Sequence, residues 1–237
     1  MSAAITPEAK KSVTEYLGIL IWDGIPRIER WLIDYAAAED SPYVRSASRA
    51  MLVAAVRRAR QPGCRFDQMP VLDGPQGCGK SAALRLLAVE DDWFTDLPRL
   101  DGDVRQIIGA TAGKWIVEAG ELEGLLKSNN DSDDEEDADS LPPAAALKSF
   151  LSRSVDEARM PYQVEPTHVP RQFVVVGTTA ATPYLEEATG NRRIWPIRVG
   201  RFDLGRLAEV RDQLWAEASV AEASGEAIDL AVAAVSA

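Results

Sequence analysis

The sequence predicts an α/β fold with a small all-helical subdomain at its N-terminus. Three observations indicate this. Apolar residues recur at helical spacing through the first 65 positions, and short apolar runs rich in β-branched residues follow. One of these runs leads into a glycine-rich stretch and then into strong helix formers. We therefore expect a helical subdomain over residues 1–65, a core with a parallel sheet over 66–200, and a closing helix and tail over 201–237.

The helical subdomain is predicted from three apolar stripes, each limited to one helical face. The residues of the first stripe are Val13, Tyr16, Leu17, Leu20 and Ile21. Gly24 and Pro26 mark a turn before the second stripe, and Ser41-Pro42 is a typical start for a third helix. The arginines of that third helix lie mostly off its apolar stripe, so we expect most of them to face solvent.

The core begins with an apolar run that ends at Leu72, directly before the motif Gly-x-x-x-x-Gly-Lys-Ser. Its glycines allow positive φ, and the loop N–H groups with the following helix N-terminus present positive charge to a phosphate. Lys80 would reach the outer phosphates, and the Ser81 hydroxyl would bind Mg²⁺. The alternative, a glycine-rich turn with a chance Lys-Ser, does not explain the strand, loop and helix order. The predicted nucleotide-binding residues are Gly74, Pro75, Gln76, Gly77, Cys78, Gly79, Lys80 and Ser81.

Two further apolar runs end in polar side chains. The run from Trp115 ends at Glu118, which we expect to bind Mg²⁺. Glu121 is a candidate catalytic base, although an ordinary exposed strand end explains it equally well. The run over residues 172–177 ends in Thr178 and Thr179, hydroxyls that could contact the γ-phosphate or the attacking water.

Arg192 and Arg193 follow a Gly-Asn turn. We expect the turn to project them from the end of the third strand region, where an arginine could reach the γ-phosphate of the next protomer in a homo-oligomer. A surface pair or an intrachain anchor to Asp or Glu is the alternative.

Basic and aromatic residues alternate between the second and third core strands, an arrangement that favours single-stranded DNA. These residues are Lys148, Arg153, Arg159, Tyr162 and Arg171. Ordinary surface arginines and a core tyrosine are the alternative. The net charge is −11, and the stretch 128–140 holds seven carboxylates with no Lys or Arg, which leaves −4 for the rest. We expect this stretch to be a disordered insertion, and the weak charge of the rest argues against a typical duplex-binding domain.

Composition predicts a cytoplasmic chain with no membrane segment. Two cysteines and one histidine make neither a disulfide framework nor a structural zinc site. No apolar run approaches the roughly 20 residues of a membrane helix, and the N-terminus lacks the pattern of a secretion signal.

The ordered motifs of residues 20–218 together resemble those of the virulence-associated protein E family of phage and mobile elements, which is similar to the superfamily 3 helicases. The matching segments are Trp22-Asp23-Gly24-Ile25-Pro26-Arg27-Ile28, Gln61-Pro62-Gly63-Cys64, residues 74–81, Trp115-Ile116-Val117-Glu118, Arg159-Met160-Pro161-Tyr162, Pro170-Arg171, Gly177-Thr178-Thr179, Thr189-Gly190-Asn191-Arg192-Arg193-Ile194-Trp195-Pro196 and Gln213-Leu214-Trp215-Ala216-Glu217-Ala218. The resemblance implies a P-loop NTPase core of the AAA+/superfamily 3 helicase type, with ATP and Mg²⁺ as cofactors. It also implies a homo-oligomeric ring that acts on DNA in replication, with a primase or another replication protein as a partner.

One departure from the family keeps a second function open. Family members usually follow Gly-Thr-Thr with an asparagine, a sensor amide, whereas this chain has Ala180. A nucleotide-dependent scaffold or loader of replication proteins, with weak or no ATPase activity, is therefore the alternative to a DNA helicase motor. A small-molecule kinase also uses a phosphate-binding loop, but no arginine-rich lid is evident.

Overall fold

The computed structural model describes residues 12–97, 104–120, 143–159, 165–180 and 193–230. The acidic stretch 128–140 lies outside these residues. In this part of the chain, five parallel strands form one sheet in the order β2-β3-β6-β1-β7. Their bounds are β1 (Met69–Asp73), β2 (Phe94–Asp96), β3 (Ile116–Ala119), β6 (Val174–Thr179) and β7 (Ile194–Arg198). The α/β class with a parallel sheet is confirmed.

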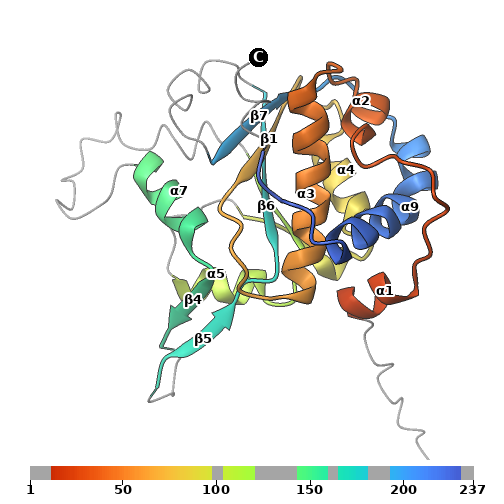
Figure 1. Ribbon diagram of the computed structural model, residues 1–237. Coiled ribbons are helices and arrows are strands. Elements are labelled where there is room, and N and C mark those ends of the chain that lie inside the picture. Colours follow the sequence, from red (N-terminus) through yellow and green to blue (C-terminus); the bar gives the residue numbers. More distant parts are fainter. Residues whose placement is uncertain (1–11, 98–103, 121–142, 160–164, 181–192, 231–237) are drawn as a thin grey trace, which may run out of the picture.

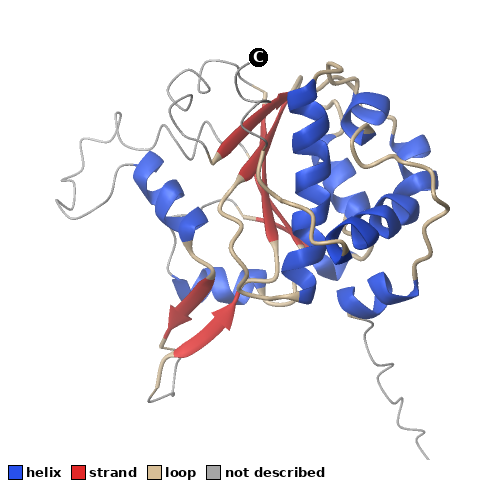
Figure 2. Ribbon diagram, in the orientation of Figure 1, coloured by secondary structure: helices blue, strands red, loops and turns tan. Residues whose placement is uncertain are grey.

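Helices cover both faces of the sheet (Figures 1 and 2). One face packs against α1 (Val13–Ile19), α2 (Trp31–Ala36), α3 (Pro42–Arg60), α4 (Lys80–Leu87) and α9 (Leu204–Ala223). The other face packs against α5 (Val104–Thr111) and α7 (Pro143–Ser152). A short 3-10 helix, η1 (Asp91–Trp93), precedes β2, and a two-stranded antiparallel hairpin of β4 (Val155–Ala158) and β5 (Thr167–Pro170) stands beside α5 and α7.

The strands are apolar on both sides because both sides are covered. Leu72 and Val176 belong to the core on the α3 and α9 side, whereas Val71 and Val175 belong to the core on the α5 and α7 side. This alternation is the period of two that a strand imposes on its side chains. It also explains why the apolar runs in the sequence are continuous rather than alternating.

The helices of the first 65 residues share one apolar core with the sheet and with α9. The Trp115 indole, directly before β3, donates to the Ala55 carbonyl of α3 at 2.8 Å. Two polar contacts join the first helices to α9. The Tyr16 hydroxyl donates to Asp212 Oδ1 at 2.7 Å, and Glu217 Oε2 accepts the backbone N–H groups of Arg27 and Ile28 at 2.5 and 3.0 Å.

Two details differ from the expectations for the helical region. Helix α1 ends at Ile19, so the last member of its apolar stripe, Ile21, lies beyond the helix and is 84% exposed. Arg58 of α3 is buried rather than solvated, because its guanidinium donates to the Phe66 carbonyl at 2.6 Å. Burial lowers the pKa of this guanidinium. Among the described helices, none combines the length and the apolar character needed to cross a membrane.

Candidate functional site

The glycine-rich loop, residues 74–79, connects the carboxyl end of β1 to the first residue of α4. Gly77 and Gly79 adopt φ of 75° and 100°, in the region that disfavours side chains. Gly74 is constrained differently: a Cβ atom there would lie only 2.5 Å from the Val199 carbonyl oxygen. Glycine is therefore required at these positions either by backbone conformation or by the close approach of another segment.

The segment that follows β7 packs against this loop. The Phe202 N–H donates to the Cys78 carbonyl at 2.8 Å, and the Gly200 N–H donates to the Ala36 carbonyl at 2.7 Å. A Cβ atom at Gly79 would lie 3.3 Å from Phe202 Cβ. Val199 and Phe202 are not predictable from the sequence, because nothing in their residue types signals a contact with a loop more than 120 positions earlier.

Lys80, the first residue of α4, folds over the loop that precedes it. Its Nζ donates to the Gly74 carbonyl at 2.6 Å and to the Pro75 carbonyl at 3.0 Å, and lies 3.6 Å from Cys78 Sγ. The ammonium group is thus held at the mouth of the loop, beside the N-terminal end of α4. Backbone N–H groups at such a helix end attract anions.

Ser81, Glu118 and Thr178 converge beside the loop. Glu118 Oε1 accepts a hydrogen bond from Ser81 Oγ and another from Thr178 Oγ1, each 2.7 Å long. The three side chains come from α4, β3 and β6, and Glu118 is only 3% exposed. A buried carboxylate with two hydroxyl partners at the carboxyl edge of a parallel sheet is typical of a ligand site.

Other predicted residues lie at the same edge or outside the described part. Thr179 is 3% exposed and aligns with Asp73 across β6 and β1, and its carbonyl accepts the Gly74 N–H at 3.2 Å. Glu121 lies outside the described residues, as do Arg192 and Tyr162. Arg198 was not predicted, yet it ends β7 with Nε 3.9 Å from Asp73 Oδ2 and is 79% exposed.

The expectation that Arg193 projects from the same edge as Thr178 and Thr179 is wrong. Ile194, the next residue, aligns with Met69 at the start of β1, so Arg193 lies at the amino edge of the sheet. There its Nε donates to Asp67 Oδ2 at 3.0 Å. The physical reason is the parallel connection: the chain must return from the carboxyl edge of β6 to the amino edge before β7 begins.

The expectation that Arg171 contacts nucleic acid is also wrong. Its guanidinium is 2% exposed, forms two 2.6 Å bonds to the Asp156 carboxylate, and donates to the Phe150 carbonyl at 2.6 Å. The other described members of that set are placed differently. Lys148 on α7 and Arg159 after β4 are exposed, and Arg153 between α7 and β4 is half-buried.

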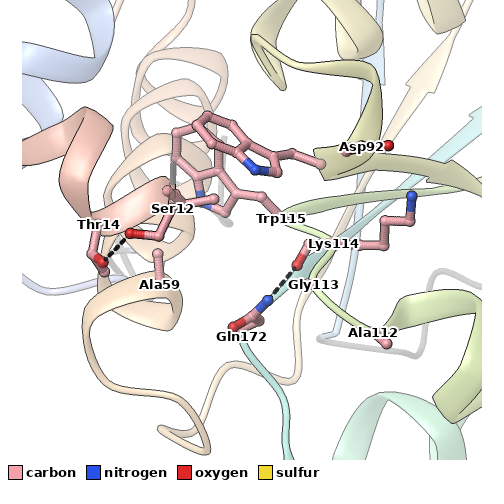
Figure 3. A pocket seen from close by; sticks show the side chains of 11 residues that line it. Ser12, Thr14, Ala59, Asp92, Ala112, Gly113, Lys114, Trp115 and Gln172 are labelled. Atoms are coloured by element: carbon pink, nitrogen blue, oxygen red, sulfur yellow. Dashed lines mark hydrogen bonds between the residues drawn. The ribbon is translucent and has the colours of Figure 1, made fainter. Parts of the chain in front are cut away.

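A cavity of about 500 Å³ lies at the opposite, amino edge of the sheet. Figure 3 shows its lining, in which the Ser12 and Thr14 hydroxyls face one another near Ala59 and the Gln172 amide donates to the Lys114 carbonyl. None of the residues predicted from the glycine-rich motif lines it.

Comparisons with known proteins place the chain in a family. A family model described as the virulence-associated protein E-like domain matches residues 17–235, so the chain belongs to this family, as the sequence motifs indicated. No curated protein matches it. Two solved structures of the NrS-1 C-terminal region have a similar fold. The first is 13% identical with a TM-score of 0.54, and the match covers 89% of this chain and 49% of the solved chain. The second is 12% identical with a TM-score of 0.50, and the match covers 86% of this chain and 46% of the solved chain. This chain thus spans about half the length of these structures.

Proposed function

We propose that this member of the virulence-associated protein E-like family binds ATP with Mg²⁺ at the glycine-rich loop and hydrolyses it. Its core would then be a P-loop ATPase of the AAA+/superfamily 3 helicase type. The observation that supports this most directly is the convergence of Ser81 and Thr178 on the buried Glu118, next to the loop that ends in Lys80. A chance Gly-x-x-x-x-Gly-Lys-Ser sequence would not require a hydroxyl and a carboxylate from separate elements to meet there.

The residues of the loop fit the chemistry of a triphosphate. Lys80 now donates to two carbonyls of the loop, and it would exchange these neutral acceptors for phosphate oxygens, which bind an ammonium more strongly. The N–H groups of the loop and of the first turn of α4 would bind the remaining oxygens.

Ser81 and Glu118 fit a magnesium ion. Both present oxygen atoms, the donors that Mg²⁺ prefers, and they already lie 2.7 Å apart. The described residues contain no cluster of three or more His, Cys, Asp or Glu side chains suited to a metal. This agrees with Mg²⁺, which is usually held by one or two protein ligands together with substrate phosphates. When bound, the ion would neutralise charge that develops on the phosphates.

We further propose that the protein is a homo-oligomeric motor that acts on single-stranded DNA during replication. Lys148, Arg153 and Arg159 are the described residues that support a DNA contact. They lie on or beside α7 and β4, on the face of the sheet opposite α4 (Figure 1). Their positive charges suit a DNA strand that is bound through its phosphates and not through its base sequence.

The alternative is a nucleotide-dependent scaffold or loader of replication proteins that hydrolyses ATP weakly or not at all. Ala180 favours it, because a methyl group directly after Thr179 cannot orient a water molecule as a sensor amide would. The net charge of −11 also favours a protein partner, such as a primase, over extensive DNA contacts.

Nucleotide binding and turnover, measured with and without single-stranded DNA, separate these functions. The native protein should bind ATP·Mg²⁺, and DNA should raise turnover if the protein is a motor. Lys80→Ala should lose ATP binding or turnover while keeping its melting temperature. Lys114→Ala is the matched control, because this lysine lies at the opposite edge of the sheet. Normal ATP affinity and turnover in Lys80→Ala would exclude the glycine-rich loop as the site.

A further inference from the structure

Asp96 ends β2 at the same edge of the sheet as the glycine-rich loop, and its residue type alone does not mark it as a site residue. It aligns with Glu118 across the parallel β2–β3 pair. Aligned residues of neighbouring strands lie about 4.8 Å apart, and their side chains point to the same face. The face is that of α4, because Phe94 and Ile116, two residues before Asp96 and Glu118, belong to the core on this side.

The position of the Asp96 carboxylate agrees with this register. Its Oδ1 lies 3.4 Å from the point where a Cβ atom at Gly120 would stand. Gly120 is two residues beyond Glu118, so it shares the Glu118 face and lies further towards the carboxyl edge. The carboxylate of Asp96 is therefore beside the end of β3, on the side where Ser81 and Thr178 meet Glu118.

The two carboxylates have different surroundings. Glu118 is buried and already accepts two hydroxyl hydrogen bonds through one oxygen. Asp96 is exposed, and within the described part of the chain its carboxylate forms no hydrogen bond or ion pair. Glu118 is thus hydrogen-bonded to two hydroxyls, whereas Asp96 faces water. Two neighbouring carboxylates in such different surroundings are suited to different roles at one site.

We propose that Asp96, in place of the sequence-based candidate Glu121, is the general base that orients and deprotonates the water attacking the γ-phosphate. This rests on the proposed ATPase function. The water oxygen forms a bond to the γ-phosphorus while the bond from that phosphorus to the bridging oxygen breaks, and the bond's electron pair leaves with ADP. The proton of the water passes to an Asp96 oxygen and from there to bulk solvent, to which Asp96 is open.

The test compares Asp96→Asn with native protein in ATP binding and in hydrolysis. Asparagine keeps the shape of the side chain but cannot accept the proton, so turnover should fall about 10²–10⁴-fold. Affinity for ATP·Mg²⁺ should stay within about threefold of native, because the residue does not hold the phosphates. Asp96→Glu should recover part of the turnover. Asp91→Asn, the same change at an exposed acid of η1, should leave turnover unchanged.

The possible results distinguish the role of Asp96 from the ATPase function itself. Hydrolysis by Asp96→Asn at a rate within about threefold of native would overturn the role of Asp96 and leave the proposed ATPase function standing. A native protein that does not bind ATP, or binds it without hydrolysis, would overturn the ATPase function and the general base together. Equal losses of ATP affinity and melting temperature in Asp96→Asn and Asp96→Glu would show a structural role instead.

Discussion

Arg171 and Asp156 form a two-pronged ion pair across the β4–β5 hairpin, with both side chains only 2% exposed. The guanidinium also stacks on the Phe150 ring, 4.2 Å from its centroid. The whole Arg171 guanidinium is thus bound by groups of the protein, where the hairpin packs against α7.

We expect Arg171→Ala to destabilise the protein by about 3–5 kcal/mol, because it leaves the Asp156 carboxylate buried without a partner. Denaturant unfolding measures this loss directly. Arg171→Ala combined with Asp156→Ala should recover part of the stability, whereas a single variant as stable as native would contradict the buried pair.

Glu118→Gln should keep ATP binding but lose Mg²⁺-dependent hydrolysis. The amide retains the size of the side chain and one acceptor oxygen for Ser81, but it removes the charge that attracts the cation. Calorimetry with ATP, with and without Mg²⁺, together with a phosphate-release assay, checks both parts. Unchanged turnover would show that the role of β3 has been misassigned.

Arg193→Ala should reduce stability by about 1 kcal/mol at neutral pH, because the Arg193 side chain is 34% exposed and Arg65 still contacts the buried Asp67 carboxylate in the variant. Burial raises the pKa of Asp67, but hydrogen bonds from Arg193 and Arg65 outweigh it and leave the pKa below its ordinary value. A lowered carboxyl pKa stabilises the folded state above the unfolded-state pKa, and this contribution disappears as pH falls through the folded-state pKa. The difference between native and variant should therefore be full near pH 7 and shrink below about pH 4.

Denaturant curves at several pH values measure that difference. Arg65→Ala is the comparison, because Arg65 contacts the same carboxylate from an 84% exposed position and should matter less. A difference between native and Arg193→Ala that does not change with pH would remove Asp67 from the explanation.

Replacing Lys148, Arg153 and Arg159 together with alanine should weaken single-stranded DNA binding about tenfold or more. It should also reduce the dependence of affinity on salt by about 0.7 in log–log slope for each phosphate that the protein no longer neutralises. Fluorescence anisotropy with an oligothymidine at two salt concentrations checks both effects. Arg85→Ala, on the opposite face of the sheet, is the control. Native protein that binds ATP but shows no DNA affinity at low salt would contradict the DNA interface.

Arg192 lies outside the described residues, so its role in completing a neighbouring subunit's site stays a prediction. Arg192→Ala should bind ATP nearly normally yet hydrolyse it about 10³–10⁵-fold more slowly, the effect of a trans arginine. Mixing it with Lys80→Ala should restore part of the turnover, because an intact arginine can then face an intact glycine-rich loop. No recovery on mixing, or full activity in a strictly monomeric protein, would contradict a shared site.

The parts of the fold that depend on neighbouring residues could be predicted from the sequence. The strand, loop and helix around residues 74–81 follow from local composition, and continuous β-branched runs such as 174–176 predict strands buried on both faces. The environment of a charged side chain could not be predicted, because it depends on partners brought together by the fold. In the sequence Arg171 looks like a surface arginine, and only the fold brings Asp156 opposite it. In the sequence Arg193 looks like a site residue, and only the strand order shows that it lies at the amino edge of the sheet.

Asp96 shows the same limit for the candidate site. A lone aspartate at the end of a three-residue strand has no pattern around it that distinguishes it from a surface acid. Only the pairing of β2 with β3 places it beside Glu118. Periodicity shows which side chains face a core, whereas the order of the strands decides which strand ends become neighbours.

The hydrogen bonds of Asp212 with Tyr16 and of Glu217 with Arg27 and Ile28 have a consequence for how the chain folds. They join segments that are about 190 residues apart, and β1 likewise needs β7, which is 125 positions later in the sequence. Such distant pairings slow folding, because the chain must lose the entropy of closing long loops before any interaction across them stabilises it. On the ribosome, β1 therefore waits for β6 and β7 to emerge, and the first helices wait for α9. Over that interval the protein exposes apolar surface and an unpaired strand edge, the features that chaperones recognise in incomplete chains.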